Sequence, residues 1–431
     1  MTVTKKEYKN IGETLYSTEL DNGLRIFVIP KKGFSSYYAV FGTNYGGAMR
    51  RFALDGQTLD TPAGVAHFLE HKMFDMPDGE NALNKLSENG ADPNAFTSSG
   101  VTCYHFSCTD KFEENLRTLL RFVSTPYFTP ETVQKEQGII GQEIQMGDDS
   151  PGRAVYYNLL ALLYDHHPIK DNVAGTVESI AQITDETLYS CHKAFYAPSN
   201  MVLCVEGDVV PETVFRIAEE VLPRERQSIP HADFGEKEGP LPCCTRKETH
   251  MPVSAPQFLI GAKDESAVFE GESLHIFRER ILSELSLRLL LGSSSHYYSK
   301  YYADGTLTRD FDYEVDYSAE TATIIIGGES PNPDKALEAL CTEVNAVAEK
   351  GFDKAYFTRT KKAMIGSRLR GLEDFDDVCV SLAMGIMDGY CALDVMDVLE
   401  SISCRDCQEW ICTNLRQEKL AFSLILPLKE A

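Results

Sequence analysis

A motif of two histidines and one glutamate restricts how this chain can fold. Residues 66–71 read Ala-His-Phe-Leu-Glu-His. On a helix, His67 and His71 are four positions apart and lie on one face, so both imidazoles can bind one metal ion. Glu70 lies beside them, where a carboxylate can reach a water in the open position of a zinc ion. The alternative is a buried helix without a metal, in which each histidine forms a hydrogen bond with another group of the protein.

A second helical segment adds carboxylates to this motif. The pattern of residues 130–146 predicts a helix that carries Glu136 and Glu143. These glutamates are seven positions apart and therefore lie on one face. Two histidines and nearby glutamates are the residue set of a hydrolytic zinc site, which favours a metal site over a buried helix without a metal.

Composition and charge narrow the class of protein. A chain of 431 residues exceeds what one hydrophobic core usually covers, so two or more domains are expected. The first ten residues contain no apolar segment, and no run of 18 apolar residues follows. We therefore expect a cytoplasmic protein with no membrane partner. The net charge of −24 disfavours nucleic acid as a partner, and it either steers cationic ligands or only solvates the surface.

The number of cysteines, twelve, is consistent with the expected cytoplasmic protein. They make up a small share of a long chain without a signal peptide, so reduced and mostly buried thiols are expected. Cys404 and Cys407 form a single C-x-x-C pair with no second pair, and one turn of a helix explains that spacing more simply than a metal or redox site.

The order of elements along the chain predicts two halves. Residues 20–30 and 37–42 read as strands joined by a Lys-Lys-Gly turn, which predicts a hairpin. Proline and glycine are frequent from about residue 224 to 247, which is typical of a linker. We predict a zinc-binding domain at 1–225, a linker at 226–245 and a related domain without a metal site at 246–431.

A short internal similarity supports that division. Residues 135–143 align with residues 360–368 at an offset of 225, and the Ile-Gly pair is kept. In this alignment Glu136 becomes Lys361 and Glu143 becomes Arg368. A duplication would mean that the second half kept the helix and lost the metal site, although coincidence stays open for so short a match.

Six stretches together resemble the pitrilysin/insulinase family of zinc peptidases, the inverzincins, over nearly the whole chain. Within the family, the resemblance is to the single-length bacterial branch, particularly members associated with aminopentanol modification of elongation factor P. The six stretches are Leu-Asp-Asn-Gly-Leu-Arg at 20–25, His-Phe-Leu-Glu-His at 67–71, Asn-Ala-Phe-Thr at 94–97, Glu136 with Glu143, Gly-Thr-Val-Glu-Ser-Ile at 175–180 and Tyr-Ala-Pro-Ser-Asn-Met at 196–201.

The resemblance implies a role for each residue of the motif. It makes His67, His71 and Glu143 the ligands of a Zn²⁺ cofactor, and it makes Glu70 the catalytic base. Glu136 matches a second glutamate near the site, which we expect to assist catalysis by orienting the ligands.

The resemblance also implies where a substrate binds. Asn94, Ala95, Phe96 and Thr97 match the segment that leads into the strand on which family members lay a peptide. An edge strand can pair with an extended peptide through backbone hydrogen bonds and so tolerate varied side chains. The alternative for Asn94 is an ordinary turn residue before a strand.

Family members of this length imply an α+β fold of two related α/β sandwich domains. Each has a mixed, largely antiparallel sheet flanked by helices, and the pair forms half of a peptidase clamshell. The other half usually supplies an Arg and a Tyr that hold the substrate carbonyl. Here Tyr301 and Thr308 stand at those positions, with Tyr297, Tyr298, Arg309 and Tyr313 as possible substitutes.

The implied function is a zinc-dependent endopeptidase acting on peptides or unfolded segments. The expected partner is a related non-catalytic chain in a heterodimer, or a second copy in a homodimer. Two other functions stay open: a dedicated processing factor for one partner protein, and a non-catalytic scaffold subunit.

Overall fold

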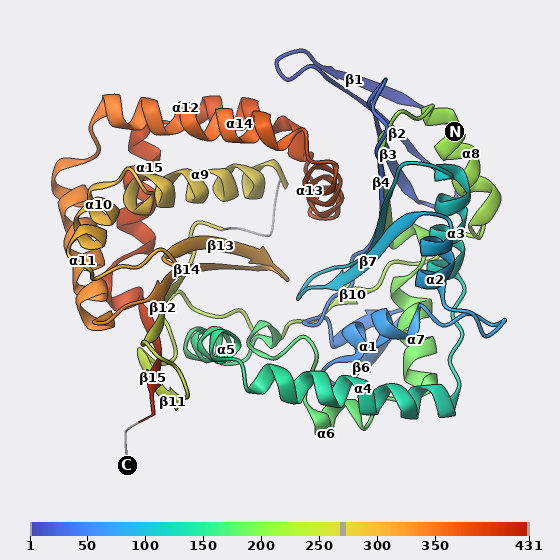
Figure 1. The fold of residues 1–431 in the computed structure, drawn as a ribbon, viewed down its shortest axis with the longest axis horizontal. Coiled ribbons are helices and arrows are strands. Elements are labelled where there is room, and N and C mark those ends of the chain that lie inside the picture. Colours follow the sequence, from blue (N-terminus) through green and yellow to red (C-terminus); the bar gives the residue numbers. More distant parts are fainter. Residues whose placement is uncertain (1, 268–272, 429–431) are drawn as a thin grey trace. The chain divides into compact units, whose positions relative to one another are not determined.

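The computed structural model describes residues 2–267 and 273–428, which form two compact units (Figure 1). The first unit takes its residues from 1–144, 172–234 and 369–393, and the second from 145–171, 235–368 and 394–431. One boundary between the units follows residue 234, inside the predicted linker, and the others follow residues 144, 171, 368 and 393. The predicted domains 1–225 and 246–431 are continuous, whereas each unit also contains a segment of the other half.

The first unit is built on a seven-stranded mixed sheet with the strand order β1-β2-β3-β9-β4-β8-β7. Only β3 and β9 run parallel, and the other neighbours are antiparallel. Its strands are β1 (Thr4–Tyr8), β2 (Glu13–Glu19), β3 (Arg25–Pro30), β4 (Tyr37–Thr43), β7 (Ala91–Thr97), β8 (Thr102–Cys108) and β9 (Met201–Gly207).

The predicted hairpin of residues 20–30 and 37–42 is wrong. Both segments form strands, β3 and β4, but β9 lies between them and pairs with each. All seven residues of β9 are buried, as expected for an apolar strand covered on both faces. The turn residues thus connect two strands that share a neighbour and do not pair with each other.

Helices cover both faces of this sheet. One face packs with α1, α3, α7 and α8 into a large apolar core, and the other face packs against α13 (Figure 1). The helices of the unit are α1 (Val65–Lys72), α2 (Ala82–Glu88), α3 (Phe112–Ser124), most of α4 (Pro130–Asp148), α6 (Val177–Ile180), α7 (Asp185–Phe195), α8 (Pro211–Val221) and α13 (Phe375–Met387), with the 3-10 turns η2 (Pro198–Asn200) and η3 (Ala392–Asp394) at or near their ends. A separate small sheet has the order β10-β5-β6, from His231–Ala232, Arg51–Leu54 and Gln57–Asp60.

The second unit contains a five-stranded sheet with the order β11-β15-β12-β14-β13, in which only β11 and β15 are parallel. Its strands are β11 (Arg246–Met251), β12 (Gln257–Lys263), β13 (Asp312–Ser318), β14 (Thr321–Glu329) and β15 (Ala421–Pro427). The helices are α5 (Pro151–Leu163), α9 (Ser273–Leu291), α10 (His296–Ala303), α11 (Pro333–Lys350), most of α12 (Lys354–Gly371), α14 (Val395–Ser401) and α15 (Cys404–Asn414), with η1 (Pro168–Lys170) and η4 (Gln417–Lys419). The observed α+β architecture, with mixed sheets flanked by helices, confirms the predicted class.

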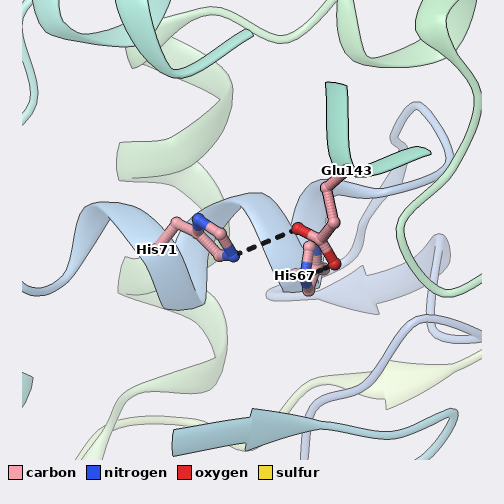
Figure 2. Close-up of side chains that lie close together, drawn as sticks. All are labelled: His67, His71 and Glu143. Carbon is pink, nitrogen blue, oxygen red and sulfur yellow. Dashed lines mark ion pairs between the residues drawn. The ribbon is translucent and has the colours of Figure 1, made fainter. Parts of the chain in front are cut away.

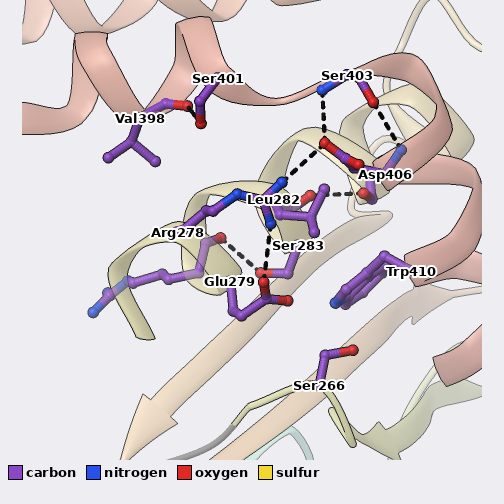
Figure 3. A network of polar contacts seen from close by, with 12 residues as sticks. Ser266, Arg278, Glu279, Leu282, Ser283, Val398, Ser401, Ser403, Asp406 and Trp410 are labelled. Carbon is purple, nitrogen blue, oxygen red and sulfur yellow. Dashed lines mark hydrogen bonds and ion pairs between the residues drawn. The ribbon is translucent and has the colours of Figure 1, made fainter. Parts of the chain in front are cut away.

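Polar contacts join α9 to α15 in this unit. Figure 3 shows the Arg278 guanidinium between Glu279, at 3.1 Å, and Asp406, at 2.9 Å. Asp406 also accepts from the backbone N–H of Ser403 and so caps α15, which begins at Cys404. The Cys404–Cys407 spacing is thus one helical turn, as predicted.

The helix predicted as a degenerate copy of α4 is present as α12. Lys361 donates to the carbonyls of Glu400 and Ile402, and Arg368 forms an ion pair with Glu284. Lys361 and Arg368 therefore make structural contacts at the positions of α12 that align with Glu136 and Glu143 of α4. Among the described helices, none alone has the length and apolar character to cross a membrane, and one pair bent by 103°, Phe375–Met387 with Ala392–Ser401, meets those criteria only in combination.

Candidate metal centre

The helix that carries the motif begins where two loops meet. Gly64 is the N-cap of α1, and its φ of 96° lies in the left-handed region that glycine tolerates. A Cβ there would lie 2.6 Å from the carbonyl oxygen of Ala174, so the close approach also requires glycine.

The partner loop needs a second glycine. Gly175 has a φ of 75°, and a Cβ would lie 2.5 Å from the carbonyl oxygen of Ala63. Ser179 Oγ donates to that same carbonyl at 2.8 Å. Residues 174–179 therefore set the position of the first turn of α1, and with it the position of His67.

Three potential ligand atoms converge between α1 and α4 (Figure 2). Glu143 reaches from α4 to both histidines, with Oε1 3.5 Å from His67 Nε2 and Oε2 3.6 Å from His71 Nε2. The three ligand atoms lie within 4.8 Å of one another. The structure thus brings together the three residues predicted as ligands, although they are 76 positions apart (67 to 143) in the chain.

These separations fit a zinc ion. With ligands at about 2.0–2.1 Å in a tetrahedron, neighbouring ligand atoms lie about 3.3–3.4 Å apart. The observed 3.5 and 3.6 Å, each to a different oxygen of Glu143, are near that spacing and long for direct hydrogen bonds. Two imidazole nitrogens and one carboxylate are a donor set that zinc accepts, and they leave a fourth position open.

Glu136 holds the other side of His71. Its Oε1 lies 3.1 Å from His71 Nδ1, so a proton on Nδ1 leaves Nε2 as the nitrogen that faces Glu143. Burial disfavours charge on His71, but the hydrogen bond and charge of Glu136, together with the charges of Glu70 and Glu143, outweigh burial and raise the pKa of His71. The structure places Glu136 behind His71 and not among the three convergent atoms.

Glu70 is buried next to His71 on the same helix, with 8% of its surface exposed. Its Oε2 accepts a hydrogen bond of 2.5 Å from the hydroxyl of Thr97. Burial raises the pKa of Glu70, which the Thr97 bond and the charge of His71 only partly offset. A carboxyl group with a raised pKa is suited to take up and return a proton near neutral pH.

The predicted substrate segment forms the edge strand β7 of the seven-stranded sheet. Asn94 is exposed, and its side chain accepts from the backbone N–H of Ala95, whereas Phe96 packs toward the face covered by α13. Ala95 packs on the opposite face, which is the face of α1, and Thr97 shares it because side chains alternate along a strand. Of the four predicted residues, only Thr97 is joined to the motif by a described hydrogen bond.

The residues at the expected carbonyl-clamp positions lie in the second unit and make contacts there. Tyr301 is buried, with its ring 5.3 Å from that of Tyr297, and Thr308 donates to the Glu329 carbonyl at 3.2 Å. Among the possible substitutes, buried Tyr297 donates to the Ala336 carbonyl at 3.1 Å. Tyr298 stacks on Tyr302 at 5.2 Å.

Sequence reasoning missed the residues that support the site. Gly64 received no role, and Gly175 and Ser179 were part of a matching stretch without a function. A glycine directly before a helix, and another in a distant loop, can indicate that two backbone segments approach each other closely. The sequence does not show which segments meet, because that contact is formed only in the fold.

The fold and this geometry define a class of protein. Two helix-borne imidazoles and a carboxylate converge within 4.8 Å of one another, with the buried carboxyl group of Glu70 on the same helix as the histidines. This is the type of site that metal-dependent hydrolases use to activate water.

Comparisons with known proteins give the family. The model described as Insulinase (Peptidase family M16) matches residues 56–177, and that described as Peptidase M16 inactive domain matches residues 182–364. A Bacillus subtilis protein called the uncharacterized zinc protease YmfH is 37% identical, over 98% of this chain and 98% of its own length.

Solved structures agree. An M16-like peptidase from Alicyclobacillus acidocaldarius has a TM-score of 0.91 at 30% identity, over 99% of both chains. A protease from Helicobacter pylori shares the fold, with a TM-score of 0.83 at 17% identity over 96% of this chain and 99% of its own. The chain therefore belongs to the insulinase family of peptidases, family M16, which confirms the predicted family.

Proposed function

We propose that this protein is a zinc-dependent endopeptidase that cleaves peptides or unfolded segments. The observation that carries the proposal is the convergence of His67, His71 and Glu143 beside buried Glu70. The same donor set supports zinc as the metal, because zinc sites of hydrolases keep three protein ligands and one open position.

The residues of the chain have separate tasks in this reaction. Zinc, when bound, would supply a Lewis acid that polarises the peptide carbonyl and acidifies a water. Glu70 removes the proton from that water and later returns it to the leaving amine. Glu136 fixes the orientation of His71, and the edge of β7 offers unpaired backbone groups to an extended substrate.

The proposal includes a second, related chain without the motif, in a cytoplasmic two-chain peptidase shaped as a clamshell. Its support is that Tyr301 and Thr308 occupy the positions expected for the Arg and Tyr that hold the substrate carbonyl, and that both make contacts within their own unit, Tyr301 with the Tyr297 ring and Thr308 with the Glu329 carbonyl. Loss of one oxyanion donor costs about 100- to 1000-fold in rate, so we expect the isolated chain to be a poor peptidase. Processing of one partner protein, in the branch associated with elongation factor P modification, is the narrower form of this proposal.

The test separates metal binding from proton transfer. After zinc loading and dialysis, elemental analysis should find about one zinc per chain, and Glu143→Gln should bind less. Glu70→Gln should keep the zinc and lose about 100- to 10,000-fold in hydrolysis of internally quenched peptides. Each variant is assayed alone and mixed with the related chain. Zinc below about a tenth of an equivalent in the wild type, or near-normal turnover by Glu70→Gln, would contradict the proposal.

A further inference from the structure

A chain of hydroxyl groups supports Glu70 from the edge of the sheet. Thr97 Oγ1 donates to Glu70 Oε2 at 2.5 Å, and the Thr102 hydroxyl oxygen lies 3.2 Å from that of Thr97. Thr102 Oγ1 also donates to the carbonyl of Tyr45 at 2.9 Å. Thr97 and Thr102 are direct partners in the β7–β8 register, so the sheet fixes their separation.

Counting protons assigns a direction to the bond between Thr97 and Glu70. A carboxylate and a backbone carbonyl only accept, and each threonine has one hydroxyl proton. Thr97 therefore directs its proton to the Glu70 carboxylate. The Thr102 hydroxyl can donate to the Tyr45 carbonyl, at 2.9 Å, or to the Thr97 oxygen, at 3.2 Å, so Thr97 donates on one side and can accept on the other.

This arrangement fixes one oxygen of a buried carboxyl group. Glu70 lies on α1 and Thr97 on β7, so their hydrogen bond ties the Glu70 carboxyl group to the edge strand. The pairing of Thr97 with Thr102, and the bond of Thr102 to the Tyr45 carbonyl, hold the Thr97 hydroxyl in place. A buried carboxyl oxygen is thus not left without a partner.

We propose that Thr97 is the positioning residue of the base, with Thr102 as its support. Thr97 then acts through Glu70 and not through the substrate, which differs from the substrate-binding role that the resemblance implies for residues 94–97. The inference rests on the proposed function, because it assigns Thr97 to the reaction in which Glu70 is the base.

The experiment compares three variants of the zinc-loaded protein, alone and with the related chain. Thr97→Val keeps the shape and removes the hydroxyl, and Thr97→Ser keeps the hydroxyl. Thr43→Val is the matched control, because it removes a buried hydroxyl of the same sheet that donates to the Phe195 carbonyl at 2.6 Å. The readouts are kcat and KM on internally quenched peptides, zinc affinity and thermal unfolding.

We expect Thr97→Val to lower kcat by about 10- to 100-fold, because the base is no longer held in place. Its KM and zinc affinity should stay within about threefold of the wild type. Thr97→Ser should recover most of kcat, and Thr43→Val should change only stability. An unchanged kcat in Thr97→Val, or a loss confined to KM, would overturn the inference and favour a substrate contact.

Failure of the proposed function gives a different result, since the wild type itself would then turn over no peptide. A crystal structure of zinc-loaded Thr97→Val decides the inference in that case too. The Glu70 carboxyl group should leave its wild-type position or occupy several rotamers. A single unchanged rotamer with the same hydrogen-bond distances to other groups would show that Thr97 does not position it.

Discussion

At the scale of single residues, we expect the contact behind His71 to affect how tightly the proposed zinc ion binds. Glu136 Oε1 lies 3.1 Å from His71 Nδ1, and a proton on Nδ1 leaves Nε2 as the nitrogen that faces Glu143. We expect Glu136→Ala to weaken zinc affinity by about 10- to 100-fold, as removal of such supporting carboxylates does elsewhere. Competition with a zinc-binding dye measures the change. Glu131→Ala removes the same charge from an exposed position of α4 and should leave the affinity unaltered; equal losses in both variants would assign the effect to charge alone.

A second buried carboxyl group, Glu206, makes stability depend on pH. Burial raises its pKa to about 8, although Lys31 lies 3.1 Å away and opposes the shift. Between about pH 4.5 and 8 the folded protein keeps this proton while the unfolded chain has lost it. Stability from this group is therefore full at low pH and is lost as the pH rises, by up to about 5 kcal/mol in total.

Urea unfolding across this range tests the sign of that effect. Glu206→Gln cannot ionise, so its free energy of unfolding should fall less steeply between pH 5 and about pH 8 than that of the wild type. Glu206→Gln also changes the contact with Lys31 and so shifts the whole curve of the variant, which is why the slope is the measurement. Parallel curves for the two proteins would mean that Glu206 has an ordinary pKa in the folded state.

At the scale of elements, the start of α1 depends on the loop that carries Gly175. Gly175 and Gly12 both have a φ of 75°, but a Cβ at Gly12 meets nothing within 4 Å, whereas one at Gly175 meets the Ala63 carbonyl at 2.5 Å. Gly12→Ala should thus lower the free energy of unfolding by about 1–2 kcal/mol, only because alanine is strained in the left-handed conformation. Gly175→Ala should cost about 1–3 kcal/mol more and weaken zinc binding, because Ala63 must move. Equal unfolding energies, with normal zinc affinity, would refute this account.

Helices and strands could be predicted from the sequence where the residue pattern that indicates them lies within one segment of the chain. The spacing of four between His67 and His71, and of seven between Glu136 and Glu143, is helical, and α1 and α4 carry them as predicted. The hairpin failed because strand pairing is not local: β9, about 160 residues after β4, supplies the partner of both strands. The hydrogen bond between Thr97 and Glu70 could not be predicted for the same reason, because it depends on how β7 packs against α1 in the fold.

At the scale of the whole molecule, the two halves of the chain exchange helices. α5 precedes the linker but packs on β12 and β15 of the second unit, and α13 follows it but packs on β4 and β9 of the first. Phe375 and Leu382 of α13 bury their side chains with Val40 and Val202 of that sheet. Sequence periodicity predicts that such helices are amphipathic, but it does not say which sheet each one covers.

This exchange predicts that the halves do not fold separately. A fragment of residues 1–235 lacks α13, so one apolar face of its central sheet is open to water and promotes aggregation. Produced alone, it should bind a hydrophobic dye and unfold without a cooperative transition. Produced together with residues 236–431, it should copurify as a complex that recovers zinc binding, because each fragment then supplies the helix that the other lacks. A soluble fragment 1–235 that unfolds cooperatively by itself would show that α13 is dispensable to the first unit.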